Sequence, residues 1–320
     1  NINKINKKKY YMKKTRTHLI IILAFFITSC SKTPIRDMAP ERVDSSVVDI
    51  PIGGYKLNNP DKHDHASILD DSHLLLGNPD NAQPNILFPN KYLMDKKYYV
   101  ESYNNTTHCP NWVSWHLDST SLGSVKRRDN FRADDGLPTT WYAINEDSYK
   151  GSGFDRGHNC PSGDRTSSEE ANSSTFLMTN LIPQAPSNNQ QTWERLEDYT
   201  RSLVRDGKNE AYIIMGSYGS GGTGRNGYLS AINTNGVQIN VPSHVWKVVV
   251  IIPNGSNDLN RINTNTRVIA VDTPNENSIN RDWKIYRTSI HAIEMATGYN
   301  LLTNLPPPVR STLQSKVDNL

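Results

Sequence analysis

The sequence predicts a mixed α+β domain with a central, largely antiparallel sheet flanked by helices. Strand-like segments outnumber helical ones, are rich in β-branched and aromatic residues, and end at Gly, Pro or Asn. Helices do not alternate regularly with them, as they would around a doubly wound parallel sheet. With 320 residues, 36% hydrophobic and 21% charged, the chain is large enough to bury a core.

The expected strands share this composition, and they cover 98–103, 111–117, 176–182, 212–216, 245–252 and 267–271. Helical signals occur at 189–205 and 290–297, and Ser187 or Asn188 would cap the first helix. The glycine-rich stretch 216–224 lacks the Gly-Lys-Ser/Thr ending of a phosphate-binding loop. We therefore expect a flexible loop there, with a phosphate cradle as the weaker alternative.

The N-terminus is typical of an export signal, which we assign to residues 1–29. A basic segment precedes an apolar run at 19–27 that is too short to span a bilayer. Small residues before Cys30 resemble the lipobox of bacterial lipoproteins, which implies cleavage there and lipidation of Cys30; an ordinary signal peptide is the alternative. The protein would be exported and membrane-anchored, facing the periplasm or the cell exterior.

The remaining chain divides into a tether and a folded domain. Residues 30–72 are rich in Pro, Asp, Ser and Asn without periodicity, which predicts a flexible tether, and 73–320 would form the domain. Removing 1–29 takes away seven positive groups and no negative ones, leaving 28 Lys and Arg against 32 Asp and Glu. Because this net charge is −4, attraction for phosphate has to come from a local group of basic side chains.

Two further cysteines, Cys109 and Cys160, form an even pair in an oxidising compartment. A disulfide and two buried thiols both stay open for this pair. A zinc site that adds His108 and His158 is disfavoured, because the usual close pair of cysteines is missing and His158 would lose its basic nitrogen.

The first segment with chemical character is 153–165. Arg, His and Asp crowd there beside Gly and Pro, which is the composition of an exposed, shaped turn rather than a strand interior. His158 can accept a proton near neutral pH, as a general base must. Gly157 would allow close approach of a ligand or a positive φ, and Arg156 offers a planar cation to phosphate oxygens.

The second such segment is 179–201. Asn189, Trp193, Glu197 and Arg201 are four residues apart, so on a helix they form one slowly drifting stripe. A hard cation prefers oxygen ligands, and Mg²⁺ keeps several waters, which suits the Asn189 oxygen together with waters held by Glu197. Arg201 would bind phosphate beside them, whereas Trp193 is assigned to the core.

Together the two segments resemble the DNA/RNA non-specific endonucleases of the ββα-metal class, which include endonuclease G-like proteins. The family pattern Asp-Arg-Gly-His matches 155–158, and two downstream patterns match in order and spacing. The matching downstream residues are Asn180, Pro183, Gln184, Asn189, Gln190, Trp193, Leu196 and Glu197. The similarity of pattern runs over about 74–306, and it implies the ββα-metal nuclease fold.

The resemblance also implies residue roles. His158 would activate water, Asn189 would be the one direct protein ligand of Mg²⁺ (Mn²⁺ or Ca²⁺ being alternatives), and Glu197 would hold waters around the ion. Arg156 and Arg201 would position phosphate.

The family has a further arginine upstream of an aromatic residue and an Asp. Here either Arg127 or Arg128 matches it, and Arg127 is favoured. Asn180 would support the site without taking part in chemistry.

The activity implied is hydrolysis of DNA and RNA phosphodiesters without sequence preference, leaving 5′-phosphate ends. One alternative is a non-catalytic surface module that binds nucleic acid, and another is a phosphodiesterase for small phosphoesters. The sequence leaves open the oligomeric state, a homodimer included, and the identity of any inhibitor protein.

Overall fold

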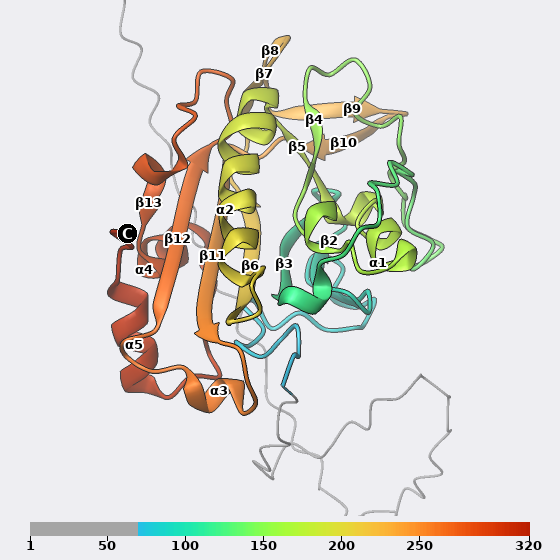
Figure 1. Cartoon of the computed structure of the whole chain (residues 1–320). Coiled ribbons are helices and arrows are strands. Elements are labelled where there is room, and N and C mark those ends of the chain that lie inside the picture. The colour runs from blue at the N-terminus through green and yellow to red at the C-terminus, as the bar shows by residue number, and fades with distance from the viewer. Residues whose placement is uncertain (1–69) are drawn as a thin grey trace, which may run out of the picture. The chain divides into compact units, whose positions relative to one another are not determined.

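The computed structural model describes residues 70–320 (Figure 1). The predicted export signal, Cys30 and all but the last three residues of the predicted tether lie outside this range. Those last residues contact the domain, because the Asp70 carboxylate accepts hydrogen bonds from the backbone N–H groups of Asn257 and Asp258. Between residues 70 and 320 no helix is both long and apolar enough to cross a bilayer.

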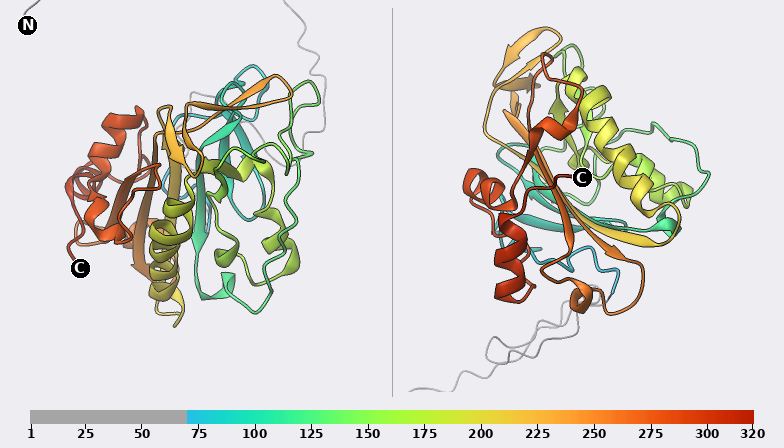
Figure 2. Two further views of the ribbon diagram at one scale, coloured as in Figure 1. Left: turned by 90° about the horizontal axis from the view of Figure 1, so that it is seen from above. Right: turned by 60° about the vertical axis from the view of Figure 1, so that its left-hand side comes forward.

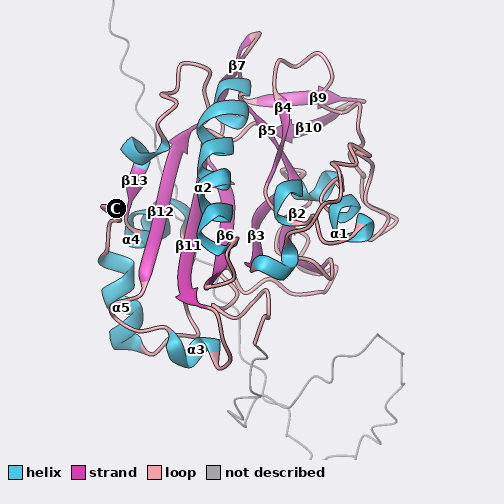
Figure 3. Ribbon diagram, in the orientation of Figure 1, coloured by secondary structure: helices cyan, strands magenta, loops and turns pink. Residues whose placement is uncertain are grey.

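A seven-stranded sheet forms the centre, in the order β1-β2-β3-β6-β11-β12-β13, and every neighbouring pair is antiparallel. Its strands are β1 (Tyr92–Asp95), β2 (Val100–Asn104), β3 (Cys109–Leu117), β6 (Asn209–Tyr218), β11 (His244–Pro253), β12 (Arg267–Pro274) and β13 (Arg287–Thr288). Three two-stranded ribbons accompany it (Figure 3): β4 (Asp155–His158) with β5 (Leu181–Gln184), β7 (Gly222–Gly224) with β8 (Gly227–Leu229), and β9 (Ala231–Thr234) with β10 (Val237–Asn240). The predicted α+β class is confirmed.

The α-helices are α1 (Glu169–Ser174), α2 (Glu194–Val204), α3 (Asp258–Arg261), α4 (Ile290–Thr297) and α5 (Pro307–Ser315). A π-helical turn, Asn188–Trp193, leads directly into α2, and 3₁₀ turns occur at Ser119–Ser121, Ser162–Asp164, Met178–Asn180 and Trp283–Tyr286. The bounds of α4 agree with the prediction because both ends carry strong signals. Ser289 caps its N-terminus, and Gly298 ends it with φ +74°.

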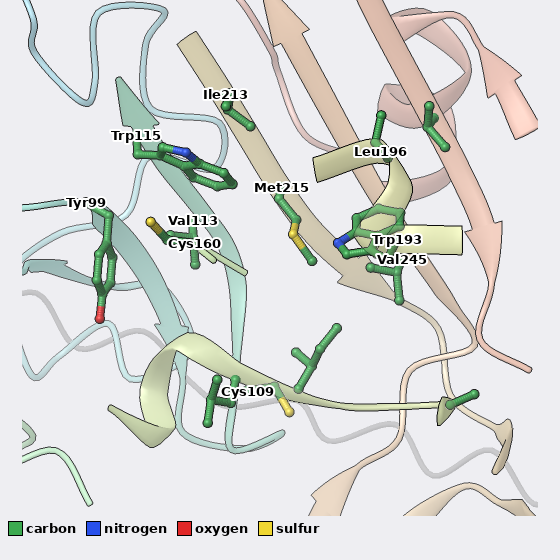
Figure 4. Packing of buried hydrophobic residues seen from close by; sticks show 14 of the residues in the cluster. Tyr99, Cys109, Val113, Trp115, Cys160, Trp193, Leu196, Ile213, Met215 and Val245 are labelled. Carbon is green, nitrogen blue, oxygen red and sulfur yellow. The ribbon is translucent and has the colours of Figure 1, made fainter. Parts of the chain in front are cut away.

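The sheet is buried on both faces, and alternate residues of each strand serve different cores. On β11, Val245 and Val249 belong to the core beneath α2, whereas Trp246 and Val248 belong to the core beneath α4 and α5. Figure 2 (right) shows α2 and the two C-terminal helices on opposite sides of the sheet, and Figure 4 shows the first core. Burial on both faces explains why β11 reads as a nearly continuous apolar run.

Five predicted strands coincide with β2, β3, β6, β11 and β12, but the one at 176–182 is wrong in its first part. Met178–Asn180 is a 3₁₀ turn, and only the last two residues of the predicted strand belong to β5. The cause is the buried Asn180 side chain, which binds the backbone of Cys160 on both sides and the carbonyl of Thr175. These hydrogen bonds fold the chain where β propensity alone favours extension.

Two other expectations are also corrected. Asp155–His158 is strand β4 and not an exposed turn, because it pairs with β5 over its whole length. The glycine-rich stretch is not a loop throughout, because it contains the end of β6 and all of β7, which pairs with β8.

One buried acid should make stability depend on pH. Glu101 on β2 is fully buried, and its carboxyl group makes no hydrogen bond of ordinary geometry within residues 70–320. Burial raises the pKa of Glu101 to about 8, opposed by Lys96 and assisted by Asp134. As pH rises from its unfolded pKa to this value, the unfolded chain loses the proton first, so stability falls.

We expect Glu101→Gln to remove this loss, since the amide is nearly isosteric and does not ionise. The free energy of unfolding of the variant relative to wild type should increase between about pH 5 and pH 8. Urea titrations at the two pH values measure it, and a difference that stays constant would contradict the assignment.

Candidate active site

The site is built on the ribbon β4–β5 and the helix that follows it. The pairing sets His158 opposite Leu181 and Asp155 opposite Gln184. Gly157 has neither a positive φ nor an open surface, contrary to expectation. A Cβ at this position would lie 2.2 Å from the Gln184 Oε1 atom, so glycine is needed to let the Gln184 side chain cross the ribbon.

All six residues predicted for the site line one cavity of about 420 Å³. They are Arg127, Arg156, His158, Asn189, Glu197 and Arg201, and they are joined by Pro161, Ser162, Gly163, Gln190 and Glu194. The lining comes from the segment between β3 and β4, from β4, from the loop that joins β4 to α1, and from the π-helical turn with α2. Segments that are separate in sequence therefore converge on a single concave surface.

His158 ends β4 and is 8% exposed, with its ring packed against Phe131 and Phe176 at centroid distances of 5.7 and 5.0 Å. The ring makes no hydrogen bond within residues 70–320, and its Nε2 is buried without a partner. Burial, and then the charges of Arg127 and Arg156, lower the pKa of His158 to about 3. The imidazole is therefore neutral at neutral pH and able to accept a proton.

The same two phenylalanines hold the neighbouring arginines. The Arg156 guanidinium lies 3.8 Å from the Phe131 ring centroid, and that of Arg127 lies 4.9 Å from the Phe176 centroid. Arg127 also donates to Ser162 Oγ at 2.9 Å. Of the two candidate arginines, Arg127 lines the cavity, whereas Arg128 is not among the lining residues and pairs with Glu169 at 3.1 Å.

Asn189 is oriented by the carboxylate of Asp155, a residue to which sequence analysis assigns no role. Asp155 Oδ2 accepts a hydrogen bond from Asn189 Nδ2 at 2.9 Å and another from Gln190 Nε2 at 2.8 Å. Because the amide nitrogen of Asn189 is engaged in this way, its oxygen is the atom left for a ligand in the cavity. Asp155 and Asn189 thus join β4 to the start of the helix.

A π-helical turn changes the spacing of the residues predicted to lie on one side of the helix, Asn189, Trp193, Glu197 and Arg201. The Glu194 N–H reaches the carbonyl of Asn189, five residues back, so this turn is wider than an α-helical one. Trp193 is buried at 1% exposure, as predicted for a core residue, while Asn189 and Glu197 line the cavity on either side of it in sequence. Such turns are frequent at functional sites.

A buried lysine beneath the cavity was missed. Lys247 on β11 is 2% exposed and lies 3.5 Å from Glu197 Oε1, above the rings of Trp193 and Trp115. Burial raises the pKa of Glu197 and lowers that of Lys247, while their opposite charges act against both shifts. The sequence feature that could have identified Lys247 is its position as the one Lys, Arg, Asp or Glu inside the apolar strand β11, on the face that α2 covers.

Arg201 is fixed by two carboxylates. Its Nη1 donates to Asp164 Oδ1 at 2.9 Å and its Nη2 to Asp198 Oδ1 at 2.6 Å. Asp164 also accepts from Trp115 Nε1, while Arg165 donates to backbone carbonyls and is buried. Asp164 therefore positions Arg201, and Arg165 has a structural role.

Cys109 and Cys160 are both buried free thiols, so the disulfide alternative is not realised in this structure. One group of potential metal ligands lies elsewhere in the described part of the chain: Asp71, His116, Glu210 and Asp258. None of its members lines the cavity, and Arg261 already pairs with Glu210 and Asp258. The group therefore says nothing about an ion in the cavity.

A two-stranded ribbon followed by a helix, enclosing a neutral imidazole and several arginines, defines the class as a ββα-type hydrolase of phosphodiesters. Residues 78–307 match the model of the DNA/RNA non-specific endonucleases, and the chain belongs to this family. It is thus a hydrolase that acts as an endonuclease on nucleic acid, in a family of metal-dependent enzymes.

Relatives agree with this assignment. A nuclease of Nostoc sp. is 47% identical over 247 residues, which cover 77% of this chain and 86% of the relative. Mitochondrial endonuclease G of Homo sapiens is 32% identical over 217 residues, covering 67% and 70%. The crystal structure of the EndoG/EndoGI complex contains a chain of 21% identity that matches with a TM-score of 0.58 over 73% of this chain and 91% of its own, which shows the fold.

Asn189 is predicted from the sequence as the protein ligand of Mg²⁺, and on that prediction removal of the Asp155 carboxylate, which orients Asn189, should weaken metal binding. We expect Asp155→Ala to raise the half-saturating Mg²⁺ concentration about 10- to 100-fold, the usual scale for a group that orients a ligand. Asp155→Asn keeps one acceptor oxygen, so its affinity for Mg²⁺ should fall by less than that of Asp155→Ala. Titration of activity and of bound metal by calorimetry measures both, and an unchanged affinity in Asp155→Ala would remove the orienting role.

The depressed pKa of His158 can be observed directly. Because burial and two arginines hold it at about 3, the imidazole should stay neutral from about pH 8 to about pH 5. Ring ¹⁵N shifts of the protein, assigned by loss of the signal in His158→Ala, measure it. A protonation midpoint near the ordinary histidine value would be incompatible with this environment.

Proposed function

We propose that the protein cleaves internal phosphodiester bonds of both DNA and RNA, with His158 as the general base and Asn189 as the direct protein ligand of Mg²⁺. The observation that carries the proposal is the convergence of a neutral imidazole, an oriented amide oxygen and three arginines on one cavity. Each group corresponds to one need of the reaction: a proton acceptor, a ligand for a hard cation and cations for the phosphate.

The base is the first requirement. A water molecule gives a proton to the neutral His158 ring as its oxygen forms a bond to phosphorus. The bond from phosphorus to the 3′ oxygen breaks, this oxygen takes a proton from solvent to become the 3′ hydroxyl, and the phosphate stays on the 5′ end of the downstream fragment. A low pKa makes His158 a weak base, and its advantage is that it is unprotonated at every pH near neutrality.

The cavity also suits a hard cation. Apart from the His158 imidazole, the uncharged and anionic donors that line it are oxygens, among them those of Asn189, Glu194 and Glu197, and no thiol lines it within residues 70–320. When bound, Mg²⁺ supplies Lewis-acid stabilisation of the charge that gathers on the phosphate and the leaving oxygen. Mn²⁺ or Ca²⁺ share the preference for oxygen and are the alternative ions.

Breadth of substrate follows from what the arginines contact. Arg127, Arg156 and Arg201 would bind phosphate oxygens, and the cavity offers them in rigid settings: two over aromatic rings and one between carboxylates. Contacts to phosphate position a strand without reading its bases. Cleavage of both DNA and RNA without sequence preference is therefore expected.

The place of action is a proposal from the sequence alone. We infer from residues 1–30 that the protein is exported and held at a membrane by lipid on Cys30, facing the periplasm or the cell exterior. A nuclease held there would meet nucleic acid from outside the cytoplasm.

Replacing the base should abolish most activity. For His158→Ala we expect at least a ~10²-fold fall in the rate of supercoiled-plasmid nicking, the scale of losing a general base, with Mg²⁺ affinity kept. His291→Ala, an exposed histidine on α4, is the matched control and should cleave at the wild-type rate.

Chelation with EDTA should stop cleavage by the wild type. Retention of plasmid nicking by purified His158→Ala, or by the wild type in EDTA, would overturn the proposed mechanism.

A further inference from the structure

A second cavity, of about 740 Å³, adjoins the catalytic one. Arg127, Arg156 and Asn189 line both, so the two cavities lie side by side and share a wall. The far wall of the second cavity comes from the loop 146–154 and from the turn that joins β7 to β8, with Arg225 and Asn226. None of the far-wall residues belongs to the predicted site.

We propose that a nucleic-acid strand continues from the scissile phosphate into this second cavity, where Arg225 binds the phosphate of a flanking nucleotide. The inference rests on the proposed function and adds to it a specific residue for binding the polymer. It also gives a role to the glycine-rich segment, which runs directly into the β7–β8 turn.

The turn is held in place by hydrogen bonds to backbone carbonyls of the loop 146–154. The Arg225 N–H donates to the carbonyl of Gly153 at 2.9 Å, and Asn226 Nδ2 donates to the carbonyl of Gly151 at 3.0 Å. A Cβ on Gly224 would lie 2.7 Å from the Gly153 oxygen, so this approach requires glycine. The guanidinium of Arg225 thus extends from a fixed point on the cavity wall.

Among the described residues 70–320, Arg225 has no partner for its side chain, whereas the other cations of this cavity each have one. Arg127 pairs with Asp129 at 2.6 Å, and Lys150 lies 3.7 Å from Asp147. The Arg156 guanidinium is stacked on an aromatic ring and donates to a carbonyl. Arg225 is exposed, and its side chain makes no hydrogen bond or ion pair within residues 70–320.

The charges that line the second cavity make phosphate binding there depend on the unpaired guanidinium of Arg225. Four cations line it, Arg127, Lys150, Arg156 and Arg225, and so do four carboxylates, those of Asp129, Glu146, Asp147 and Asp155. The balance is neutral, so a phosphate is not attracted by net charge and needs one donor free to bind it. A guanidinium without a partner is that donor, because it offers paired N–H groups at no cost of breaking an ion pair.

The test compares Arg225→Ala with Arg205→Ala, an exposed arginine at the C-terminal end of α2 that lines neither cavity. Both are made in the His158→Ala background, and binding of a single-stranded 30-mer is followed by fluorescence anisotropy at several salt concentrations. We expect Arg225→Ala to raise Kd about three- to tenfold and to lower the slope of log K against log salt by ~0.7, the value for one lost phosphate contact on a single strand. Arg225→Lys should keep the slope.

A second arm uses bis(4-nitrophenyl) phosphate with the intact base. This small diester has a single phosphate and no flanking nucleotide, so Arg225→Ala should hydrolyse it at the wild-type kcat/KM while KM for the oligonucleotide rises. The role of Arg225 would be overturned if Arg225→Ala bound the oligonucleotide with the same Kd and salt dependence as Arg205→Ala. It would also be overturned if kcat/KM of Arg225→Ala fell as much on the small diester as on the oligonucleotide. Failure of the wild type to cleave any substrate would instead overturn the proposed function, and the anisotropy arm would still decide on Arg225.

Discussion

One carboxylate, that of Asp155, holds the two halves of the site together. It sits on β4 and accepts hydrogen bonds from the amides of Asn189 and Gln190 at the start of the helix. At the other end of the ribbon, the Asn180 side chain binds both backbone groups of Cys160. With the ribbon fixed at both ends, His158 and Asn189 have a set relation, although thirty residues of chain separate them.

The site lies on a core rather than on loops alone, and this sets its electrostatics. Burial against Phe131 and Phe176 keeps His158 neutral, and Lys247 reaches Glu197 from a strand interior. A buried ion pair of this kind adds little net stability, because desolvation offsets the attraction. The ion pair instead fixes the position of the Glu197 carboxylate, because Lys247 holds it in one place before a ligand binds.

The sequence predicted the parts of the site that depend on local pattern. The four-residue spacing put Asn189, Glu197 and Arg201 on one side, and the central strands followed from their β-branched composition. It missed what depends on distant partners: the π-helical turn, the role of Asp155 and the position of Lys247. Asp155–His158 looked like a turn because its polar residues face a cavity, and only pairing with β5 makes it a strand.

Long-range partners also decide which arginines are free to act. A net charge of −4 beyond residue 29 gives no general attraction for nucleic acid, so the two cavities have to work by individual side chains. Arg201 and Arg127 are held in fixed positions by their carboxylate partners, so under the proposed function each would exchange one acceptor for another when phosphate binds. The unpaired guanidinium of Arg225 would add binding energy without such an exchange. On the proposal, Arg225 therefore contributes to binding of the strand beside the scissile bond, whereas the paired arginines position the scissile phosphate.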